Sequence, residues 1–233
     1  MKKVKSILAI AVLLCCITHM NAQEQRYMNV HLKNGTTTQV LVSEIDSIKF
    51  VSELPKEWVE INGVKWATRN VDMPGTFAAN PEDAGMFYQW NRQLGWSSTD
   101  PMVNSNGDTT WDETPATGDT WAKANDPCPT GWRVPTKEEL QSLANYFSVW
   151  TTTLNGVTGR VFGGCNNTLF LPAAGCRNDS TGERYHVGTY GYYWSSTPIS
   201  TTDAYLLDFS SSYVYASNRI NRANGFSVRC VAE

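Results

Sequence analysis

The segment DPCPTGWRVPTKEELQSLANYF, residues 126–147, constrains the fold more than any other part of the chain. Thr136 is followed three residues later by Glu139, which is a capping-box signature: each side chain accepts a hydrogen bond from the backbone N–H of the other residue. Apolar residues then recur at helical spacing, so the sequence predicts a helix after Thr136 with one buried stripe. The residues of this stripe are Leu140, Leu143, Ala144 and Phe147.

The N-terminus has the features of a secretory signal peptide. Three lysines precede an apolar run over residues 7–17, and small residues end at Ala22, so we expect residues 1–22 to be cleaved and the protein to be exported. The run is too short to cross a bilayer, and no later stretch of the sequence is long and apolar enough. Attachment of a lipid is the alternative, because Cys15 and Cys16 end the run, although neither follows the small residue that such a site prefers.

The four cysteines outside the predicted leader suggest disulfides. They are Cys128, Cys165, Cys176 and Cys230, and an even number in an oxidising compartment favours disulfides over metal thiolates. No CxxC spacing indicates a zinc site. Four cysteines allow three pairings, of which we favour Cys128–Cys230 with Cys165–Cys176. The longer bridge would stabilise the fold by about 4–5 kcal/mol in the chain-entropy account.

Composition argues against two classes of partner. Loss of the leader changes the formal net charge from −3 to −6, because its three lysines are lost and it contains no Asp or Glu. A mildly acidic chain without a Lys/Arg run lacks the electrostatic footprint of a protein that binds nucleic acid or anionic lipid. Nine Trp and ten Tyr are in excess. Their rings could stack on sugars, although packing between short strands and loops explains most of them more simply.

Residues 23–53 are expected to form a small β-hairpin unit around Asn34-Gly35. A three-residue loop would pair Val30 with Val40 and keep the apolar side chains on one face. A short third strand is expected within residues 45–50. An isolated hairpin is marginally stable in water, so we expect this unit to pack on the main domain or to pair with another chain.

Residues 54–57 form a polar linker, and residues 58–233 carry six motifs. They are INGVKWATRNV, AGMFYQWN, DPCPTGWRVPTKEEL, LFLPAAG, YGYYWSST and GFSVRCV. In this order they resemble the Fibrobacter succinogenes major paralogous domain (FISUMP), a module of exported and surface proteins. The resemblance implies an α+β, C-type-lectin-like fold with two small antiparallel sheets, one or two helices, long loops and adjacent chain ends.

Strands are expected on both sides of Asn62-Gly63 and of residues 210–212, at residues 86–91, and in the closing GFSVRC. In that closing segment the inward-facing residues are Phe226, Val228 and Cys230. Residues 92–124 form a long polar loop, which in a compact domain is usually functional or mobile.

No catalytic residue is assigned. Formylglycine-generating enzymes of the related fold need a reactive cysteine pair, but Cys165 and Cys176 have no neighbouring His or Lys that would lower a thiol pKa. RYHVGTYG around His186 lacks the strand–turn–helix context of a Ser/His/Asp nucleophile. The acidic residues Asp83, Asp108, Asp112 and Glu113 fit solvated loops better than a glycosidase pair.

Calcium is the one cofactor that the sequence makes worth considering. Asp100, Asn104, Asn106 and Asp108 offer closely spaced oxygens, and Ca²⁺ takes about six to eight of them. Their order does not match an EF-hand loop, and the Glu-Pro-Asn and Trp-Asn-Asp motifs of calcium-dependent lectins are missing from the sequence. Turn formation is therefore the default explanation, and no metal is assigned.

Ligand-binding residues are expected in two stretches of the C-terminal half. CRNDSTGERYHVGTYGYY supplies Arg177, Asp179, Tyr185, Tyr190 and Tyr192, with Asn178 and His186 beside them. SNRINRANG supplies Asn218, Arg219, Asn221 and Arg222, followed by Asn224. Guanidinium groups, amides and Tyr rings recognise polyols and acidic sugars, which predicts a non-enzymatic adhesion module for glycans or surface proteins.

Two alternatives remain open. These side chains could instead cap loop carbonyls and fill the core. The protein could also be a structural or assembly subunit, such as a pilus-tip or matrix component, whose N-terminal hairpin lends an edge strand to a partner.

Overall fold

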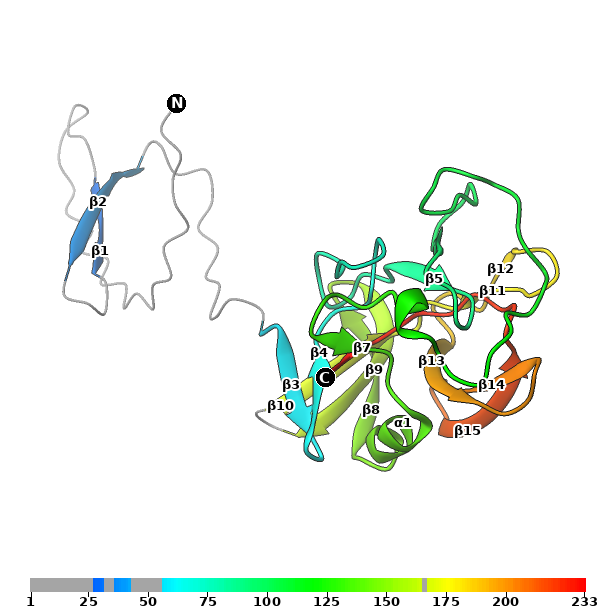
Figure 1. Ribbon diagram of the computed structural model, residues 1–233. Coiled ribbons are helices and arrows are strands. Elements are labelled where there is room, and N and C mark those ends of the chain that lie inside the picture. The colour runs from blue at the N-terminus through cyan, green and yellow to red at the C-terminus, as the bar shows by residue number, and fades with distance from the viewer. Residues whose placement is uncertain (1–26, 32–35, 43–55, 165–166) are drawn as a thin grey trace. The chain divides into compact units, whose positions relative to one another are not determined.

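The computed structural model describes residues 27–31, 36–42, 56–164 and 167–233. The chain divides into two units, Met1–Lys56 and Glu57–Glu233 (Figure 1). In the first unit, β1 (Tyr27–His31) and β2 (Thr37–Leu41) form a two-stranded antiparallel sheet. The predicted signal peptide and the predicted third strand lie outside the described residues.

The register of this hairpin differs from the prediction. Val30 pairs with Thr38 rather than with Val40, and His31 pairs with Thr37; the predicted loop falls mainly on residues 32–35, which lie outside the described residues. The shift is two residues. Because side chains alternate with a period of two, this shift leaves the same residues on the same face, so the apolar pattern could not distinguish the two registers.

The second unit is mostly β, with several small antiparallel sheets and one short α-helix (Figure 1). Its strands are β3 (Trp58–Ile61), β4 (Val64–Ala67), β5 (Met86–Tyr88), β6 (Gly95–Ser97), β7 (Trp132–Arg133), β8 (Ser148–Leu154), β9 (Val157–Gly164), β10 (Asn167–Pro172), β11 (Cys176–Arg177), β12 (Arg184–Tyr185), β13 (Gly191–Pro198), β14 (Asp203–Phe209), β15 (Val214–Asn221) and β16 (Val231–Ala232). Its helices are η2 (Lys123–Asn125), a 3₁₀ turn, and α1 (Lys137–Ala144). The sheets have the orders β3-β4-β16-β7, β10-β9-β8, β13-β14-β15, β5-β6 and β11-β12.

Helix α1 begins as the capping box predicts. The Thr136 hydroxyl accepts a hydrogen bond from the Glu139 N–H at 3.3 Å, and the Glu139 carboxylate accepts one from the Thr136 N–H at 2.7 Å. The guanidinium of Arg133, from β7, adds two bonds to the same carboxylate at 2.8 and 2.6 Å. The cap therefore also joins the helix to the strand before it.

The buried stripe of α1 is shorter than predicted. Leu140 and Leu143 are buried in the core, but Phe147 is 70% exposed. The helix ends at Ala144, with Asn145 as its C-cap. Phe147 therefore lies beyond the helix, at the start of the chain's turn into β8, and no longer follows the helical period.

The disulfide Cys128–Cys230 is present as predicted. Cys176, in contrast, is a buried free thiol, so the predicted Cys165–Cys176 bridge is wrong; Cys165 itself lies outside the described residues. The side chain of Cys176 belongs instead to a buried cluster that includes Trp194 and Phe226.

The closing segment GFSVRC is not the regular strand that was predicted. Phe226, Val228 and Cys230 are buried, but so are Ser227 and Arg229 between them, because the segment runs through the interior with protein on both sides. Its backbone bonds go in turn to Tyr88, Tyr192, Trp194, Val71 and Ala67. Regular pairing resumes at β16, which joins β4 and β7 and places the C-terminus beside the first hairpin of this unit (Figure 1).

Candidate functional site

A pocket of about 270 Å³ is lined by residues of β11, β12, β13 and β15 and of the segments that follow β11, β12 and β15. We call it the aromatic pocket. Four of its eight lining residues carry rings: Tyr185, His186, Tyr192 and Phe226. Two amides, Asn178 and Asn224, contribute polar groups, and Ile220 and Cys176 complete the lining. Five of these eight residues come from the stretch 176–192, which the sequence singled out as ligand-binding.

Backbone hydrogen bonds and strand pairing fix the conformation of the loop that carries Tyr185 and His186. Tyr185 pairs with Cys176 across β11 and β12, and His186 adopts a left-handed conformation with φ of 62°. The carbonyl of His186 accepts hydrogen bonds from the N–H groups of Thr189 and Tyr190, which closes the turn. A Cβ on Gly175 would lie 2.2 Å from the Tyr185 carbonyl oxygen, so the close approach of this loop requires glycine at position 175.

The rings of the pocket support one another. Tyr192 stacks on Phe226 with centroids 5.2 Å apart and planes 18° apart, and its hydroxyl pairs with Nδ1 of His186 at 2.9 Å. Burial raises the pKa of Tyr192, so this hydroxyl stays protonated at neutral pH. The wall is therefore preorganised rather than assembled by a ligand.

The two amides leave complementary groups for a ligand. Oδ1 of Asn178 accepts hydrogen bonds from the N–H groups of Ser180 and Thr181, so its Nδ2 remains as a donor. Nδ2 of Asn224 donates to the carbonyl of Asn221, so its Oδ1 remains as an acceptor. One donor and one acceptor suit a hydroxyl-bearing ligand, since each hydroxyl can both donate and accept.

Cys176 does not act as a reactive thiol here. Burial raises its pKa to about 11, which leaves little thiolate at neutral pH. Nucleophilic cysteines need the opposite environment, because the thiolate is the reactive species.

Arg177 is not available to a ligand, contrary to the prediction. Its side chain is 1% exposed. The guanidinium donates to the carbonyls of Ser97, Gly182 and Thr99 at 2.8, 2.6 and 2.7 Å. Arg177 therefore links the segment at residues 97–99 to the loop that contains Gly182 by hydrogen bonds.

Arg222 has the same kind of role. It is buried, lies 3.9 Å from the ring centroid of Trp90, and donates to loop carbonyls. These carbonyls belong to Ala116, Gly118, Ser200 and Asp203. For both arginines the alternative reading from the sequence, that they cap loop carbonyls, describes the structure.

The other predicted residues fall into two groups. Tyr190 lies beside the pocket residue Tyr192, with ring centroids 6.0 Å apart, and Asn218 lies two residues before Ile220 on β15 and so on the same face. Arg219 is exposed but pairs with Tyr205 and alternates with Asn218, so it lies on the opposite face. Asn221 accepts the N–H of Ala223 within a turn, and the Asp179 carbonyl accepts the indole N–H of Trp111. Sequence reasoning missed Ile220 and Phe226 as pocket residues, because an apolar residue gives no signal that separates a pocket wall from the core.

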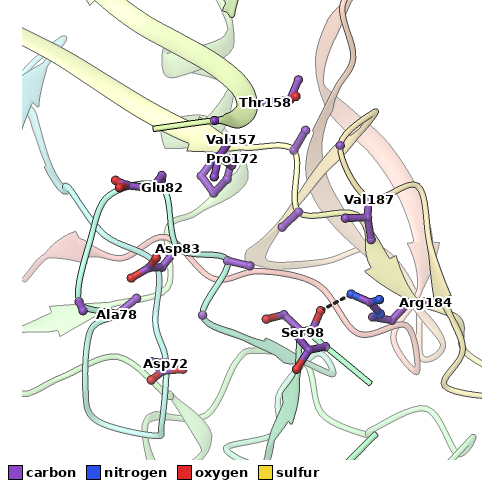
Figure 2. Close-up of a pocket in the computed structure, with 18 residues that line it drawn as sticks. Asp72, Ala78, Glu82, Asp83, Ser98, Val157, Thr158, Pro172, Arg184 and Val187 are labelled. Carbon is purple, nitrogen blue, oxygen red and sulfur yellow. Dashed lines mark hydrogen bonds between the residues drawn. The ribbon is translucent and has the colours of Figure 1, made fainter. Parts of the chain in front are cut away.

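A larger hollow of about 680 Å³ lies between the loop at residues 78–85 and the segments 156–158, 172–174 and 184–188. Figure 2 shows Glu82 and Asp83 on one side of it and Arg184 and Val187 on the other. Three of its four charged residues, all except Asp72, form hydrogen bonds or ion pairs with residues of the surrounding loops. Arg184 donates to the Ser98 carbonyl and to Asp100, Asp83 accepts from Asn80, and Glu82 accepts from Asn155. The aromatic pocket is therefore the better candidate for recognition.

The residues considered for calcium have loop roles. Oδ1 of Asn104 accepts hydrogen bonds from the N–H groups of Asn106 and Asp108, and Asp100 pairs with Arg184. Within the described ranges, no three His, Cys, Asp or Glu side chains gather closely enough to hold a metal ion. In the same part of the chain, no helix has the length and apolar character needed to cross a bilayer.

A family model, the Lcl C-terminal domain, matches residues 82–232. The chain belongs to this family. The family is the one to which the six sequence motifs pointed, so the resemblance to FISUMP is confirmed. The matched range contains the aromatic pocket and both cysteines of the disulfide. Comparison with curated proteins gave no match, and comparison with solved structures gave none either.

Proposed function

We propose that the Lcl C-terminal domain of this chain is a non-enzymatic binding module that recognises a glycan in the aromatic pocket. The observation that carries the proposal is the combination of a stacked ring wall with one unused amide donor and one unused acceptor. A pyranose presents a face of C–H groups and a rim of hydroxyls. Flat rings can cover the C–H face, and amides can form hydrogen bonds with the hydroxyls.

The chemistry of the pocket supports binding rather than catalysis. Its thiol is held protonated, and the hydroxyl of Tyr192 is engaged with His186. Hydrolysis would need two convergent acidic or basic groups near a bound substrate. The lining instead supplies rings, amides and aliphatic carbon.

A C-type-lectin-like fold and an exported, surface-displayed location belong to the same proposal. The adjacent ends of the second unit, its long loops and its bridge between Cys128 and Cys230 are features expected of that fold. The apolar run in the predicted leader supports export.

The test is a glycan array followed by binding measurements on the full-length protein and two variants. Tyr185 is exposed and lines the pocket, so Tyr185→Ala should weaken binding by about fivefold to tenfold through loss of ring contact. Tyr146→Ala is the matched control, because Tyr146 is a similarly exposed tyrosine outside the pocket lining. Binding that Tyr185→Ala leaves unchanged, or no binding to any array glycan by protein with an intact disulfide, would contradict the proposal.

One observation favours an assembly role as a second candidate. Strand β8 is an edge of the β10-β9-β8 sheet, and Phe147 and Val149 are exposed at and just before it. An exposed edge with apolar side chains can pair with another chain. A negative array together with concentration-dependent self-association would favour this role.

A further inference from the structure

A second aromatic surface lies on the face of the sheet that carries the aromatic pocket. Tyr213, just before β15, stacks with Tyr215, the second residue of β15, at a centroid distance of 4.9 Å and an interplanar angle of 28°. Tyr215 is 55% exposed. We call these two residues the tyrosine pair. The outer ring of such a pair offers a flat surface to solvent, which is the arrangement that stacking on a ligand requires.

The tyrosine pair is continuous with the pocket. Tyr190 lies 6.3 Å from Tyr213 and 6.0 Å from Tyr192 between ring centroids, and Tyr192 lines the pocket. Across the sheet, Tyr192 is paired with Asp208, and Asp208 is paired with Tyr215. Residues paired in this way project to the same face, so rings run from the pocket to Tyr215 without interruption.

A buried carboxylate positions the polar edge of this surface. Asp208 accepts a hydrogen bond from the Tyr213 hydroxyl at 2.9 Å and another from Nδ2 of Asn218 at 2.7 Å. With its Nδ2 engaged, the exposed Asn218 has its Oδ1 left as an acceptor. The surface thus repeats the composition of the pocket, with rings beside an amide of fixed orientation.

The charges along this surface do not suit an anionic ligand. The charged side chains bonded to its tyrosines are carboxylates: Asp208 holds Tyr213, and Glu183 accepts the hydroxyl of Tyr185 at 2.8 Å. The nearby guanidinium groups already have partners or point away. Arg177 and Arg222 are buried against loop carbonyls, and Arg219 lies on the opposite face. Arg160 donates to the carbonyls of Ser210 and Tyr213, and Arg184 donates to the Ser98 carbonyl and to Asp100. An anionic sugar would meet like charge here without a compensating cation.

We propose that the ligand is a linear, uncharged oligosaccharide that places one sugar in the aromatic pocket and extends over Tyr190 to the tyrosine pair. This inference rests on the proposed glycan-binding function and adds the length and charge class of the ligand. The pocket holds the first sugar, and Tyr215 with Asn218 forms a second subsite.

The experiment is calorimetric titration of the full-length protein with neutral gluco-, manno-, xylo- and N-acetylglucosamine oligosaccharides of one to five sugars. The affinity of the wild type for the recognised series should rise by about tenfold from one sugar to four or five. Tyr215→Ala should remove most of this rise and leave the affinity for the single sugar unchanged. Tyr185→Ala should weaken all lengths alike. Arg219→Ala is the control on the same strand, and it should behave as the wild type at every length.

The outcomes separate the two proposals. Affinity that does not depend on length, with Tyr185→Ala still weakening binding, would overturn the second subsite and leave the pocket in place. No binding to any series, or binding that Tyr185→Ala does not affect, would overturn both. A sulfated or uronic-acid oligosaccharide that binds more tightly than a neutral one of equal length at physiological salt would overturn the charge class alone.

Discussion

The second unit contains two regions whose backbone N–H and C=O groups find their hydrogen-bond partners in different ways. Around Phe209, the strands β8–β10 and β13–β15 pair in antiparallel ladders, and their side chains form one apolar cluster with Leu140 and Leu143 of α1. Around Trp90, the chain forms long loops with few paired strands. There, buried arginines donate the hydrogen bonds to backbone carbonyls that neighbouring strands would otherwise supply. Arg177 and Arg222 each donate to at least three backbone carbonyls, which in each case belong to two separate loops. We call these the strand region and the loop region.

The difference explains why Arg177 and Arg222 point into the domain, whereas Tyr185 and Tyr215 are exposed. A buried carbonyl without a partner is costly, so a loop that is packed inside a domain needs donors. A guanidinium supplies five N–H groups in a fixed plane and can serve several loops at once. Arg229 in the closing segment follows the same rule, with bonds to Asn70 and to the carbonyl of Ala67, and its burial lowers its pKa to about 10. The ligand-facing surface is then left to rings and amides.

The largest effect is expected from the strand region. Phe209 is fully buried and its ring packs near those of Phe162 and Tyr193, so Phe209→Ala should lower the free energy of unfolding by about 4 kcal/mol. Urea unfolding measures the loss. Because the ladders there depend on one another, hydrogen exchange should accelerate throughout β8–β10 and β13–β15. Acceleration confined to β14 would contradict a cooperative strand region.

Arg222→Ala tests the loop region and should have the next largest effect. It leaves the carbonyls of Ala116, Gly118 and Ser200 without their donor, so we expect a loss of about 3 kcal/mol in the free energy of unfolding. Hydrogen exchange should rise mainly in residues 112–120 and 200–203.

Arg219→Ala is the matched control for that variant. Arg219 is an exposed arginine on β15, so its removal should change stability by less than about 0.5 kcal/mol. Equal losses in the free energy of unfolding for the two variants would contradict a local stabilising role of Arg222. Faster hydrogen exchange spread evenly over the strand region after Arg222→Ala would contradict it as well.

Local rules predicted the elements whose cause lies within a few residues. The capping box at Thr136 and Glu139 is present, and Asn62 and Gly63 have the positive φ values, 51° and 78°, of the tight turn expected between β3 and β4. Tyr185 and Tyr192 line one pocket, and the expectation that they bind a ligand there stays a prediction. Each of these depends on spacing or on residue type alone.

The errors come from interactions that are distant in sequence. Arg177 was expected to face a ligand, but its partners Ser97 and Thr99 lie about 80 residues away, and no pattern around Arg177 announces them. Cys176 was expected to pair because cysteines were counted, whereas its position in a buried cluster decides its state. Phe147 follows the helical period in sequence, but the helix has already ended before it. In each case the missing information is tertiary.

The smallest effect sharpens the comparison through pH. Arg133 pairs with a carboxylate, Glu139, whereas the arginines of the loop region bind mainly neutral carbonyls. Burial alone would raise the pKa of Glu139, but the bonds from Arg133 and from the Thr136 N–H outweigh it, and the net pKa is lowered. A carboxyl whose pKa is lower in the folded state stabilises the fold above its unfolded value of about 4.5 and loses this contribution as the pH falls through the folded value. Glu139→Gln keeps the cap acceptor but removes the charge, so it should cost about 1 kcal/mol at pH 7, and the difference from wild type should shrink as the pH falls below about 4.5. The cost of Arg222→Ala, measured by urea unfolding over the same pH range, should change less. Its hydrogen-bond partners are carbonyls, which do not titrate, and the carboxylates of Asp119 and Asp203 act on it only through space. A cost of Arg222→Ala that falls at acidic pH as steeply as that of Glu139→Gln, or a constant cost for Glu139→Gln, would contradict the view that charge stabilises the capped helix and neutral hydrogen bonds stabilise the loops.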